Sequence, residues 1–348
     1  MQFSPKGASA RLGRLAGIAL SCVLLAAPQA LSKDKEVTVD LMMSPAGTGP
    51  YLAWATVQTY AKDHHDWLRP KAVEAPGFVY NVRFAATNPT IWKTTMFGSG
   101  EVVEWAAVNG KPPFFDTPLD AVKDFRVIGT LSQSSNLFVA TDPAIKSPAD
   151  FVGKRVATGL LSQNEWGMHQ RLILDGLGVT EKTKSYSPLG PNANVEALLD
   201  GRADVGTVVL HSAMGLKKNL EAGPFKTLQS SGRPWHYVSI PVPEIENYIK
   251  TTGAPFMVRT IPANTMSNQP AEVTTIGNNV LLSAHKDFPE DLAYEFVKLW
   301  VKMGPVVAKY NATGGIWDAD SIANIARLQP DRIHPGAMRA YKELGLIK

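Results

Sequence analysis

The most informative segment of the chain runs from Ile145 to Val179 and reads IKSPADFVGKRVATGLLSQNEWGMHQRLILDGLGV. A polar turn that ends at Gly153 leads into a strand-like run at 154–158, and a polar loop then leads into an amphipathic helix. The loop therefore lies between the carboxyl end of a strand and the amino end of a helix. In open α/β sheets ligands bind at such loops, because free N–H groups and the helix dipole face outward there.

The same order of strand, loop and helix recurs along most of the chain. The alternating run Val37–Met42 predicts a first strand, and a glycine- and proline-rich stretch leads from it into a helix that begins at Pro50. Alternation of this kind favours a mainly parallel, doubly wound sheet in each of two lobes. Further strands are expected at 80–85, 102–108, 125–131, 137–140, 205–210 and 273–282, and further helices at 194–200, 289–303, 321–328 and 337–344.

The first residues predict export. Three basic residues precede the apolar run Leu15–Ala27, which is too short and too rich in small residues to favour a membrane span and fits a secretory signal. The small-x-small triplet Ala30-Leu31-Ser32 offers a cleavage site. We therefore expect a signal peptide at 1–32, cleaved near Ser32, and a mature protein in the periplasm; a retained anchor is the alternative.

Removal of this signal changes the charge and cysteine arguments. The mature chain would carry 32 basic and 31 acidic residues, so the sequence pI of 8.9 supports no nucleic-acid partner. The single cysteine, Cys22, lies inside the signal, which leaves the mature chain without disulfides, thiol nucleophiles or cysteine-bound metals. No later run approaches the roughly 18 apolar residues of a transmembrane helix.

Motifs of catalysis and metal binding are absent from the sequence. There is no G-x-S-x-G, H-E-x-x-H or G-x-x-x-x-G-K-[ST] motif. The segment 47–52 starts like a dinucleotide fingerprint, but Leu52 replaces its third glycine and Pro50 removes an N–H group. In His64-His65-Asp66 the two neighbouring imidazoles would point about 100° apart on a helix, which favours a solvated helix end over a metal site. We expect no catalytic residue, metal or cofactor.

The candidate ligand contacts lie in loops that follow expected strands. Ser162 and Glu165 have the spacing of a capping box, in which Ser162 caps the Glu165 N–H and Glu165 reaches back. That leaves their neighbours to face a ligand, although Glu165 facing a cationic group stays an alternative. His211 follows a buried run, so ligand contact and local hydrogen bonding are both open. The predicted ligand-binding residues are Thr48, Tyr51, Thr87, Asn88, Gln163, Asn164, Trp166 and His211.

An anionic ligand would need an arginine or a lysine in the same place. The sequence offers several basic residues near the expected loops and does not distinguish among them. These candidates are Arg83, Lys93, Arg233 and Arg259.

Four segments resemble a known family. They are I-x-S-x-x-D-F-x-G-K-R-V at 145–156, EALLDGRAD at 196–204, FPEDLAY at 288–294 and HPGAMRAYKELGL at 334–346. Together they are similar to the TAXI group of solute receptors, which serve tripartite ATP-independent periplasmic (TRAP) transporters. The last segment is the most particular to that group, whereas the first two also occur in other two-lobed receptors.

The resemblance implies an α/β, two-lobed type II periplasmic-binding-protein fold with a ligand cleft between its lobes. We predict lobe 1 at 33–137, lobe 2 at 138–272, and a return strand with C-terminal helices at 273–348 that pack across to lobe 1. The implied function is that of a monomeric, non-catalytic receptor that captures a small organic acid or amino acid and delivers it to TRAP permease membrane subunits. The loops at 87–90 and 161–166 are bulkier than the Gly/Ser-rich loops common in the family, which indicates an unusual solute rather than glutamate.

Three other functions remain open at this point. A receptor of an ATP-driven (ABC) importer for sulfonate-like anions would share the fold and the compartment. An exported enzyme on the same two-lobed frame would need a nucleophile and base that the sequence does not display. A sensor lobe that docks on a signalling protein would bind a solute in the same way.

Overall fold

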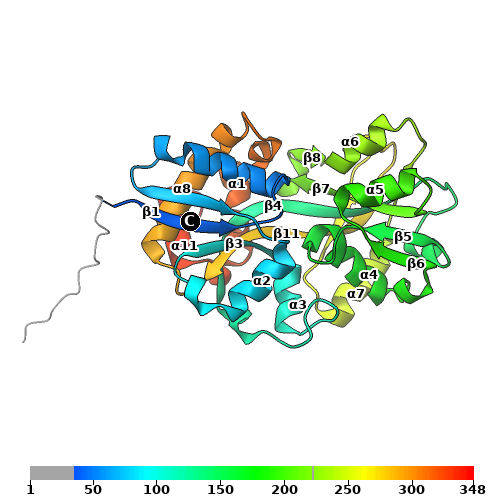
Figure 1. Cartoon of the computed structure of the whole chain (residues 1–348), viewed down its shortest axis with the longest axis horizontal. Helices are drawn as coiled ribbons and strands as arrows, with labels where there is room; N and C mark the ends of the chain where they lie inside the picture. Colours follow the sequence, from blue (N-terminus) through cyan, green and yellow to red (C-terminus); the bar gives the residue numbers. More distant parts are fainter. Residues whose placement is uncertain (1–34, 222) are drawn as a thin grey trace, which may run out of the picture. The chain divides into compact units, whose positions relative to one another are not determined.

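The computed structural model describes residues 35–221 and 223–348, so the predicted signal peptide and Cys22 lie outside the described residues. The chain forms one mixed sheet, whose main path runs β2-β1-β3-β11-β4-β7-β5-β6 (Figure 1). Its strands are β1 (Val37–Met42), β2 (Leu68–Val73), β3 (Thr95–Gly100), β4 (Phe125–Ala140), β5 (Arg155–Thr158), β6 (Ser185–Pro188), β7 (Val205–Ser212), β8 (Asn219–Glu221), β9 (His236–Val238), β10 (Met257–Ile261) and β11 (Val273–His285).

Two long antiparallel strands join two groups of shorter parallel strands. β1 pairs in parallel with β2 and β3 at one end of the sheet, and β5 pairs in parallel with β6 and β7 at the other. β4 and β11 pair with each other over most of their length and lie between these groups, as Figure 1 shows. The predicted two-lobed α/β architecture is confirmed, with one sheet that continues through both lobes.

Helices cover both faces of this sheet. β1, β2 and β3 alternate with the first helices, and β5, β6 and β7 alternate with later ones, as the sequence pattern predicts. The helices are α1 (Gly49–Tyr60), α2 (Phe78–Thr87), α3 (Glu101–Val108), α4 (His169–Gly176), α5 (Pro191–Leu199), α6 (Gly223–Ser230), α7 (Val242–Thr252), α8 (Glu290–Val307), α9 (Ala319–Ile322), α10 (Asn324–Leu328) and α11 (Pro335–Glu343).

Two predicted strands are wrong, because 80–85 and 102–108 lie in the helices α2 and α3. Valine and aromatic residues favour strands locally, but here tertiary packing decides. In α2 the buried apolar residues recur with a helical spacing, as do those of α3. The buried apolar positions are Phe78, Val79, Val82 and Ala85 in α2, and Val102, Val103, Ala106 and Ala107 in α3.

The expected short strands at 125–131 and 137–140 are one strand, β4. The polar run Ser132–Asn136 between them suggests a loop by composition. In the structure every residue of that run is buried and paired within the sheet. The polar run therefore lies in the interior of a strand and does not end it.

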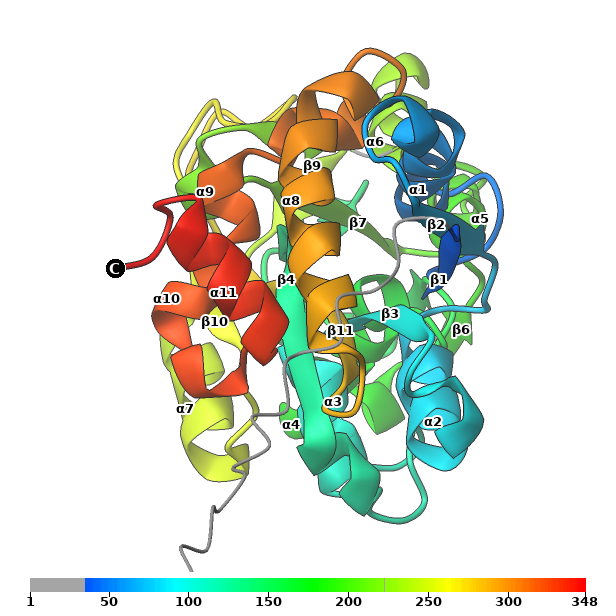
Figure 2. The same cartoon turned by 90° about the vertical axis from the view of Figure 1, so that its left-hand side faces the viewer.

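The core of the first lobe depends on the C-terminal helices. α8 and α11 lie side by side over β4 (Figure 2), and their apolar faces join those of α1 and β1 in one cluster. At its centre the ring of Trp54 lies 5.2 Å from that of Trp300 and 4.7 Å from that of Trp317. Trp54 and Trp300 are core residues, since neither is exposed.

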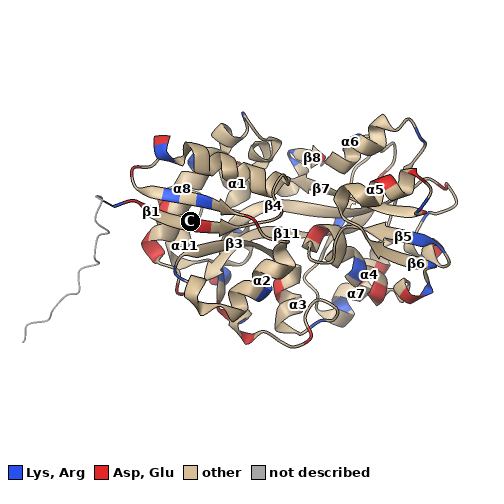
Figure 3. Ribbon diagram, viewed as in Figure 1, with Lys and Arg blue, Asp and Glu red and all other residues tan. Residues whose placement is uncertain are grey.

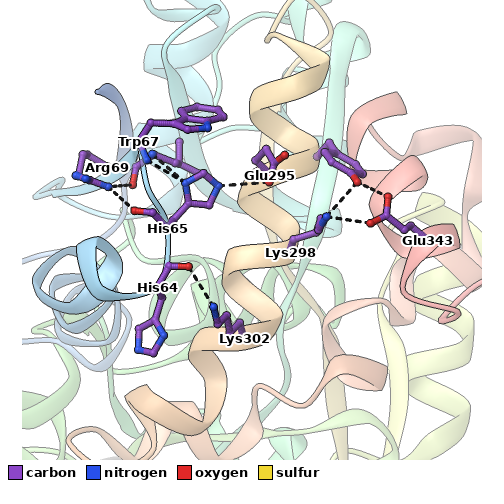
Figure 4. Close-up of polar contacts among 10 residues, drawn as sticks. His64, His65, Trp67, Arg69, Glu295, Lys298, Lys302 and Glu343 are labelled. Atoms are coloured by element: carbon purple, nitrogen blue, oxygen red, sulfur yellow. Dashed lines mark hydrogen bonds and ion pairs between the residues drawn. The ribbon is translucent and has the colours of Figure 1, made fainter. Parts of the chain in front are cut away.

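Hydrogen bonds of the segment His64–Asp66 connect the start of β2 to α8 (Figure 4). His65 Nδ1 accepts a hydrogen bond of 3.0 Å from the Leu68 N–H, so its Nε2 carries the proton and donates to Glu295 Oε2 at 3.3 Å. Lys302 of α8 donates to the His64 carbonyl at 3.3 Å. The predicted solvated helix end is therefore wrong for His65, which holds a structural contact.

Two further observations concern the described residues as a set. No group of three or more His, Cys, Asp or Glu side chains among them is arranged to hold a metal ion. None of the helices between residues 35 and 348 combines the length and the apolar character needed to cross a bilayer.

Replacement of Trp300 by alanine is expected to destabilise the protein by about 3–5 kcal/mol, because it would leave a cavity beside three other aromatic rings. Leu328→Ala is the matched control, since that side chain is 58% exposed and its loss is expected to cost no more than about 0.5 kcal/mol. Urea unfolding followed by tryptophan fluorescence and circular dichroism measures both. Equal effects of the two substitutions would contradict this account of the core.

Candidate functional site

Buried polar side chains gather where β4 and β11 pass from one lobe to the other. β11 contains no charged residue and β4 contains only Arg126, so both strands are tan through the middle of Figure 3. Yet residues 132–136 of β4 are polar, as are Asn278 and Asn279 of β11, and none is more than 8% exposed. We call these seven residues the polar seam. Because a buried polar group costs free energy unless it is hydrogen-bonded, such a cluster needs partners.

Strand geometry divides the polar seam between the two faces of the sheet. Successive side chains point to opposite faces, so Ser134 and Asn278 share one face and Gln133 and Asn279 share the other. Ser134 Oγ donates to Asn278 Oδ1 at 2.6 Å, and Gln133 Nε2 donates to Asn279 Oδ1 at 3.1 Å. We call the first the loop face, because the turn Asn164–Met168 packs on it, and the second the rear face.

The loop face holds the main chain of the turn at Glu165. Asn136 Nδ2 and Gln170 Nε2 donate to the Glu165 carbonyl at 2.5 and 2.7 Å. Asn136 Oδ1 lies 3.2 Å from His169 Nδ1, which therefore carries a proton. The turn that follows β5 is thus held to Asn136 of β4 through the main chain of Glu165, whose side chain is buried.

The predicted capping box at 162–165 is wrong. Gln163 is the N-cap residue of the turn, and no side chain caps it. Oε1 of the Glu165 carboxyl group instead accepts a hydrogen bond of 2.6 Å from Asn164 Nδ2.

Ser162 connects the two lobes. Its hydroxyl donates to the Pro76 carbonyl at 3.2 Å, and its own carbonyl accepts from the Val79 N–H, also at 3.2 Å. Val79 lies in the first turn of α2, where N–H groups lack partners within the helix. Gly77 makes the approach possible, since a Cβ atom there would lie 2.3 Å from the Ser162 carbonyl oxygen. We call this contact the Ser162 latch.

Burial sets the charge of the loop face. It raises the pKa of Glu165 to about 8, against smaller opposing effects of its hydrogen bonds. Burial also lowers the pKa of His169 to about 3 and that of His211 to about 4. At neutral pH the loop face therefore presents a largely protonated carboxyl group and neutral imidazoles.

The rear face contains the one basic candidate that touches the polar seam. Arg259 of β10 donates to Ser135 Oγ at 3.2 Å, to Gln133 Oε1 at 3.3 Å and to Ser212 Oγ at 3.3 Å. These partners are uncharged, and burial lowers the pKa of the guanidinium. The other three candidates, Arg83, Lys93 and Arg233, are exposed.

The structure brings some predicted ligand residues to the loop face. Asn164 is 1% exposed and bonded to Glu165, and His211 Nδ1 lies 3.2 Å from the hydroxyl of Ser132. Gln163 and Trp166 belong to the same loop, but their hydrogen bonds stay within it. The Gln163 side chain accepts from the Leu160 N–H, and the main-chain carbonyl of Trp166 accepts from the Gly159 N–H.

The first loop precedes α1, as predicted. Thr48 is the N-cap residue of α1, and its hydroxyl donates to the Pro45 carbonyl at 2.7 Å. Tyr51 is partly buried in the first turn of that helix. Both residues follow the carboxyl end of β1, on the same edge of the sheet as the loop after β2.

Thr87 and Asn88 lie elsewhere. Their prediction depended on a strand at 80–85, but that segment is α2, and both residues close its carboxyl end. Thr87 Oγ1 donates to the Arg83 carbonyl and Asn88 Nδ2 to the Phe84 carbonyl, at 2.9 and 2.8 Å. The loop that follows β2 is 74–77, which contains Gly77 of the Ser162 latch.

Sequence reasoning missed the residues of the polar seam. The run Ser-Gln-Ser-Ser-Asn at 132–136 and the pair Asn278-Asn279 stand inside otherwise apolar strands. That contrast is a usable signal, since a buried polar run in a central strand requires a partner or a ligand. Two cavities of about 420 and 170 Å³ lie apart from the polar seam, the first against α4 and Pro112-Pro113 and the second against β5 and β6.

Glu165→Gln is expected to change how stability depends on pH. A carboxyl group whose folded pKa is about 8 and whose unfolded pKa is near 4.5 contributes stability in full below pH 4.5, and loses it as pH rises through 8. Wild type should therefore lose up to about 5 kcal/mol relative to the variant over this range. Urea unfolding from pH 4 to pH 9 measures the difference between the two proteins.

The difference curve isolates Glu165, because the buried histidines are present in both proteins. Glutamine keeps an oxygen that can accept from Asn164, so the local geometry is preserved. Parallel curves over the whole range would contradict a buried, protonated Glu165.

Comparison with known proteins gives a family and a set of structural relatives. The chain is 13% identical to the periplasmic aliphatic sulphonate binding protein SsuA of Escherichia coli, with 90% of this chain and 80% of that one covered and a TM-score of 0.39. It is 16% identical to MatC of Rhodopseudomonas palustris with bound malate (88% and 96% covered, TM-score 0.43) and 13% identical to Rpa4515 of R. palustris with adipate (90% and 98% covered, TM-score 0.47). At these levels the relatives' ligands do not transfer to this chain.

The sequence profile of the NMT1-like family matches residues 96–345. This match includes β3, β4 and β11, the whole second lobe and the C-terminal helices up to α11. Because it spans more than two thirds of the chain, the protein belongs to the NMT1-like family.

Proposed function

We propose that this protein is the extracytoplasmic receptor of a TRAP transporter of the TAXI group. In this proposal an exported, monomeric chain captures a small organic acid or amino acid between lobe 1 (33–137) and lobe 2 (138–272) and delivers it to the permease membrane subunits. The observation that carries the proposal is the polar seam: buried hydrogen-bonding groups at the crossing of the lobes, met by a loop at the start of a helix.

Lobe closure is the mechanism that these contacts support. The Ser162 latch joins the second lobe to Pro76 and to the first turn of α2, through the hydroxyl and the carbonyl of Ser162, and it requires Gly77 and Ser162 to lie close together. A solute held on the loop face would be enclosed when the latch forms and released when it opens. Micromolar affinity needs about 8 kcal/mol, which several buried hydrogen bonds and one charge pair supply.

The solute contacts that we propose combine predicted and observed groups. Asn164 and His211 reach the loop face, Asn278 faces them from β11, and Thr48 and Tyr51 lie at the start of α1. A carboxylate or a sulfonate on the loop face would be held by uncharged donors, because Arg259, the arginine that touches the polar seam, lies on the rear face.

A thermal-shift panel of dicarboxylates, amino acids, aromatic acids and sulfonates tests the receptor function directly. A true solute at about 100 times its dissociation constant should stabilise the mature chain by roughly 2.7 kcal/mol, through mass action. Transport in proteoliposomes with the permease subunits should then proceed without ATP. Uptake that depends on ATP would favour the ABC alternative, and chemical turnover of a panel member would favour an enzyme.

Gly77→Ala is expected to prevent closure while each lobe stays folded. Its methyl group would lie 2.3 Å from the Ser162 carbonyl oxygen, so the latch cannot form. We expect at least a tenfold loss of solute affinity, about 1.4 kcal/mol, and no compaction on solute addition in small-angle X-ray scattering. Calorimetry measures the affinity.

Gly190→Ala is the matched control for this substitution. Gly190 is also the N-cap residue of a helix and has φ of 105° and ψ of 165°, against 145° and 174° at Gly77, but a Cβ atom there would meet only Leu160 Cγ, at 3.9 Å. The control therefore reports the backbone strain of an N-cap glycine without the clash. Equal loss of affinity in both variants would contradict the latch.

A further inference from the structure

The cavity of about 420 Å³ is lined by residues of both proposed lobes. Pro112 and Pro113 belong to the loop that follows α3, in the proposed lobe 1, and α3 lies near α4 in both views (Figures 1 and 2). The charged residues of the lining come from the proposed lobe 2: Arg171 and Asp175 of α4, and Glu181 of the short turn after it. We call this space the α4 cavity.

The loop that carries the two prolines is held in place from its buried side. The N–H groups of Phe114 and Phe115 donate to the Lys111 carbonyl, at 3.1 and 2.9 Å. Both phenylalanine side chains are buried, and they belong to the same apolar cluster as Leu172 of α4. The two proline rings are exposed, so they offer a fixed apolar surface beside α4.

The charges that line the α4 cavity do not cancel. Arg171 Nε donates to Oδ1 and Oδ2 of Asp175, at 2.7 and 2.9 Å, so these two residues form a neutral pair. Glu181 Oε1 lies 3.6 Å from Arg171 Nη2, which is too long for a hydrogen bond, and the Glu181 side chain is 90% exposed. The lining therefore keeps one negative charge, on Glu181.

Two lysines lie next to lining residues in the sequence but do not line the cavity themselves. They are Lys111 and Lys182. The Lys111 ammonium lies over the ring of Trp105, 5.2 Å from its centre. The negative charge of Glu181 is thus available to a group from outside the chain.

A long basic side chain of another protein fits this lining. Its aliphatic stem would pack on the proline rings, and its charged end would pair with Glu181. Because Glu181 and both prolines are exposed, a protein surface can cover the site and exclude water from it. A small free cation would gain little there, since an exposed ion pair contributes at most about 1 kcal/mol.

We propose that the α4 cavity is the docking site for an extracytoplasmic loop of the permease that presents a lysine or an arginine. This proposal rests on the proposed receptor function and names the contact through which the receptor would deliver its solute. Since both lobes line the cavity, the complete site exists only when the lobes are closed. By linkage, solute binding and docking must then strengthen each other by the same factor.

Uptake into proteoliposomes that contain the permease measures docking, with the solute that the thermal-shift panel identifies. Glu181→Lys should raise the receptor concentration at half-maximal uptake at least tenfold, because like charges would then face each other. Glu196→Lys is the matched control, since it makes the same charge change at an exposed residue of α5 that does not line the cavity. It should leave this concentration unchanged.

Two further measurements separate docking from folding and from solute binding. Neither Glu181 nor Glu196 belongs to the polar seam, so both variants should bind the solute in calorimetry with the affinity of wild type, and both should unfold in urea as wild type does. Permease in nanodiscs, at saturation, should strengthen the binding of solute to wild type. Equal binding of the permease to the solute-free and the solute-loaded receptor would contradict a site lined by both lobes.

The outcomes separate this docking site from the receptor function. If no panel member binds wild type, or wild type supports no uptake, both proposals are contradicted. If the solute binds but Glu181→Lys supports uptake at the same receptor concentration as wild type and Glu196→Lys, the docking site alone is contradicted. A receptor dimer in analytical ultracentrifugation that Glu181→Lys dissociates would assign the cavity to a second copy of the chain, and it would also contradict docking to the permease.

Discussion

The polar seam exists because the two lobes share the same two strands. β4 and β11 run from the parallel strands of one lobe to those of the other, so their middle residues are covered on both faces of the sheet. A polar group in such a place must find a partner or lose the stability that water would have given it. Ser134 Oγ donates to Asn278 Oδ1 across the strands, and Asn136 Nδ2 donates to the main-chain carbonyl of Glu165. The position of the candidate ligand loop follows from these pairings.

The same strand geometry separates charges. Successive side chains of β4 point to opposite faces of the sheet. Gln133 and Ser135 therefore contact Arg259 on the rear face, and Asn136 contacts Glu165 on the loop face. Two ionisable groups of opposite sign thus lie on either side of one sheet without pairing. Each keeps uncharged partners, and burial acts on each in the expected direction, raising the pKa of the acid and lowering that of the base.

Much of the fold could be predicted from the sequence, and much of the candidate site could not. α8 could be predicted because its apolar residues recur with a helical period, and β11 because it is a short run rich in apolar and β-branched residues. α2 was missed because its valines and aromatic residues favour a strand locally, and this error displaced the second loop to Thr87 and Asn88. The role of Glu165 could not be predicted, because the spacing of Ser162 and Glu165 does not show that Ser162 bonds to the other lobe and that Asn164 bonds to the Glu165 side chain.

The sharing of β11 also bears on how the chain is made. Residues 273–348 supply the strand that pairs with β3 and the helices that complete the core around Trp54, so the lobe that begins the chain is finished by its end. The pairings of β4 with β7, and of β5 with β6, need nothing after residue 212. During synthesis from the N-terminus, those strands of the second lobe can form while the first lobe still lacks part of its sheet. The second lobe would then fold before the first, although the first lobe begins the chain.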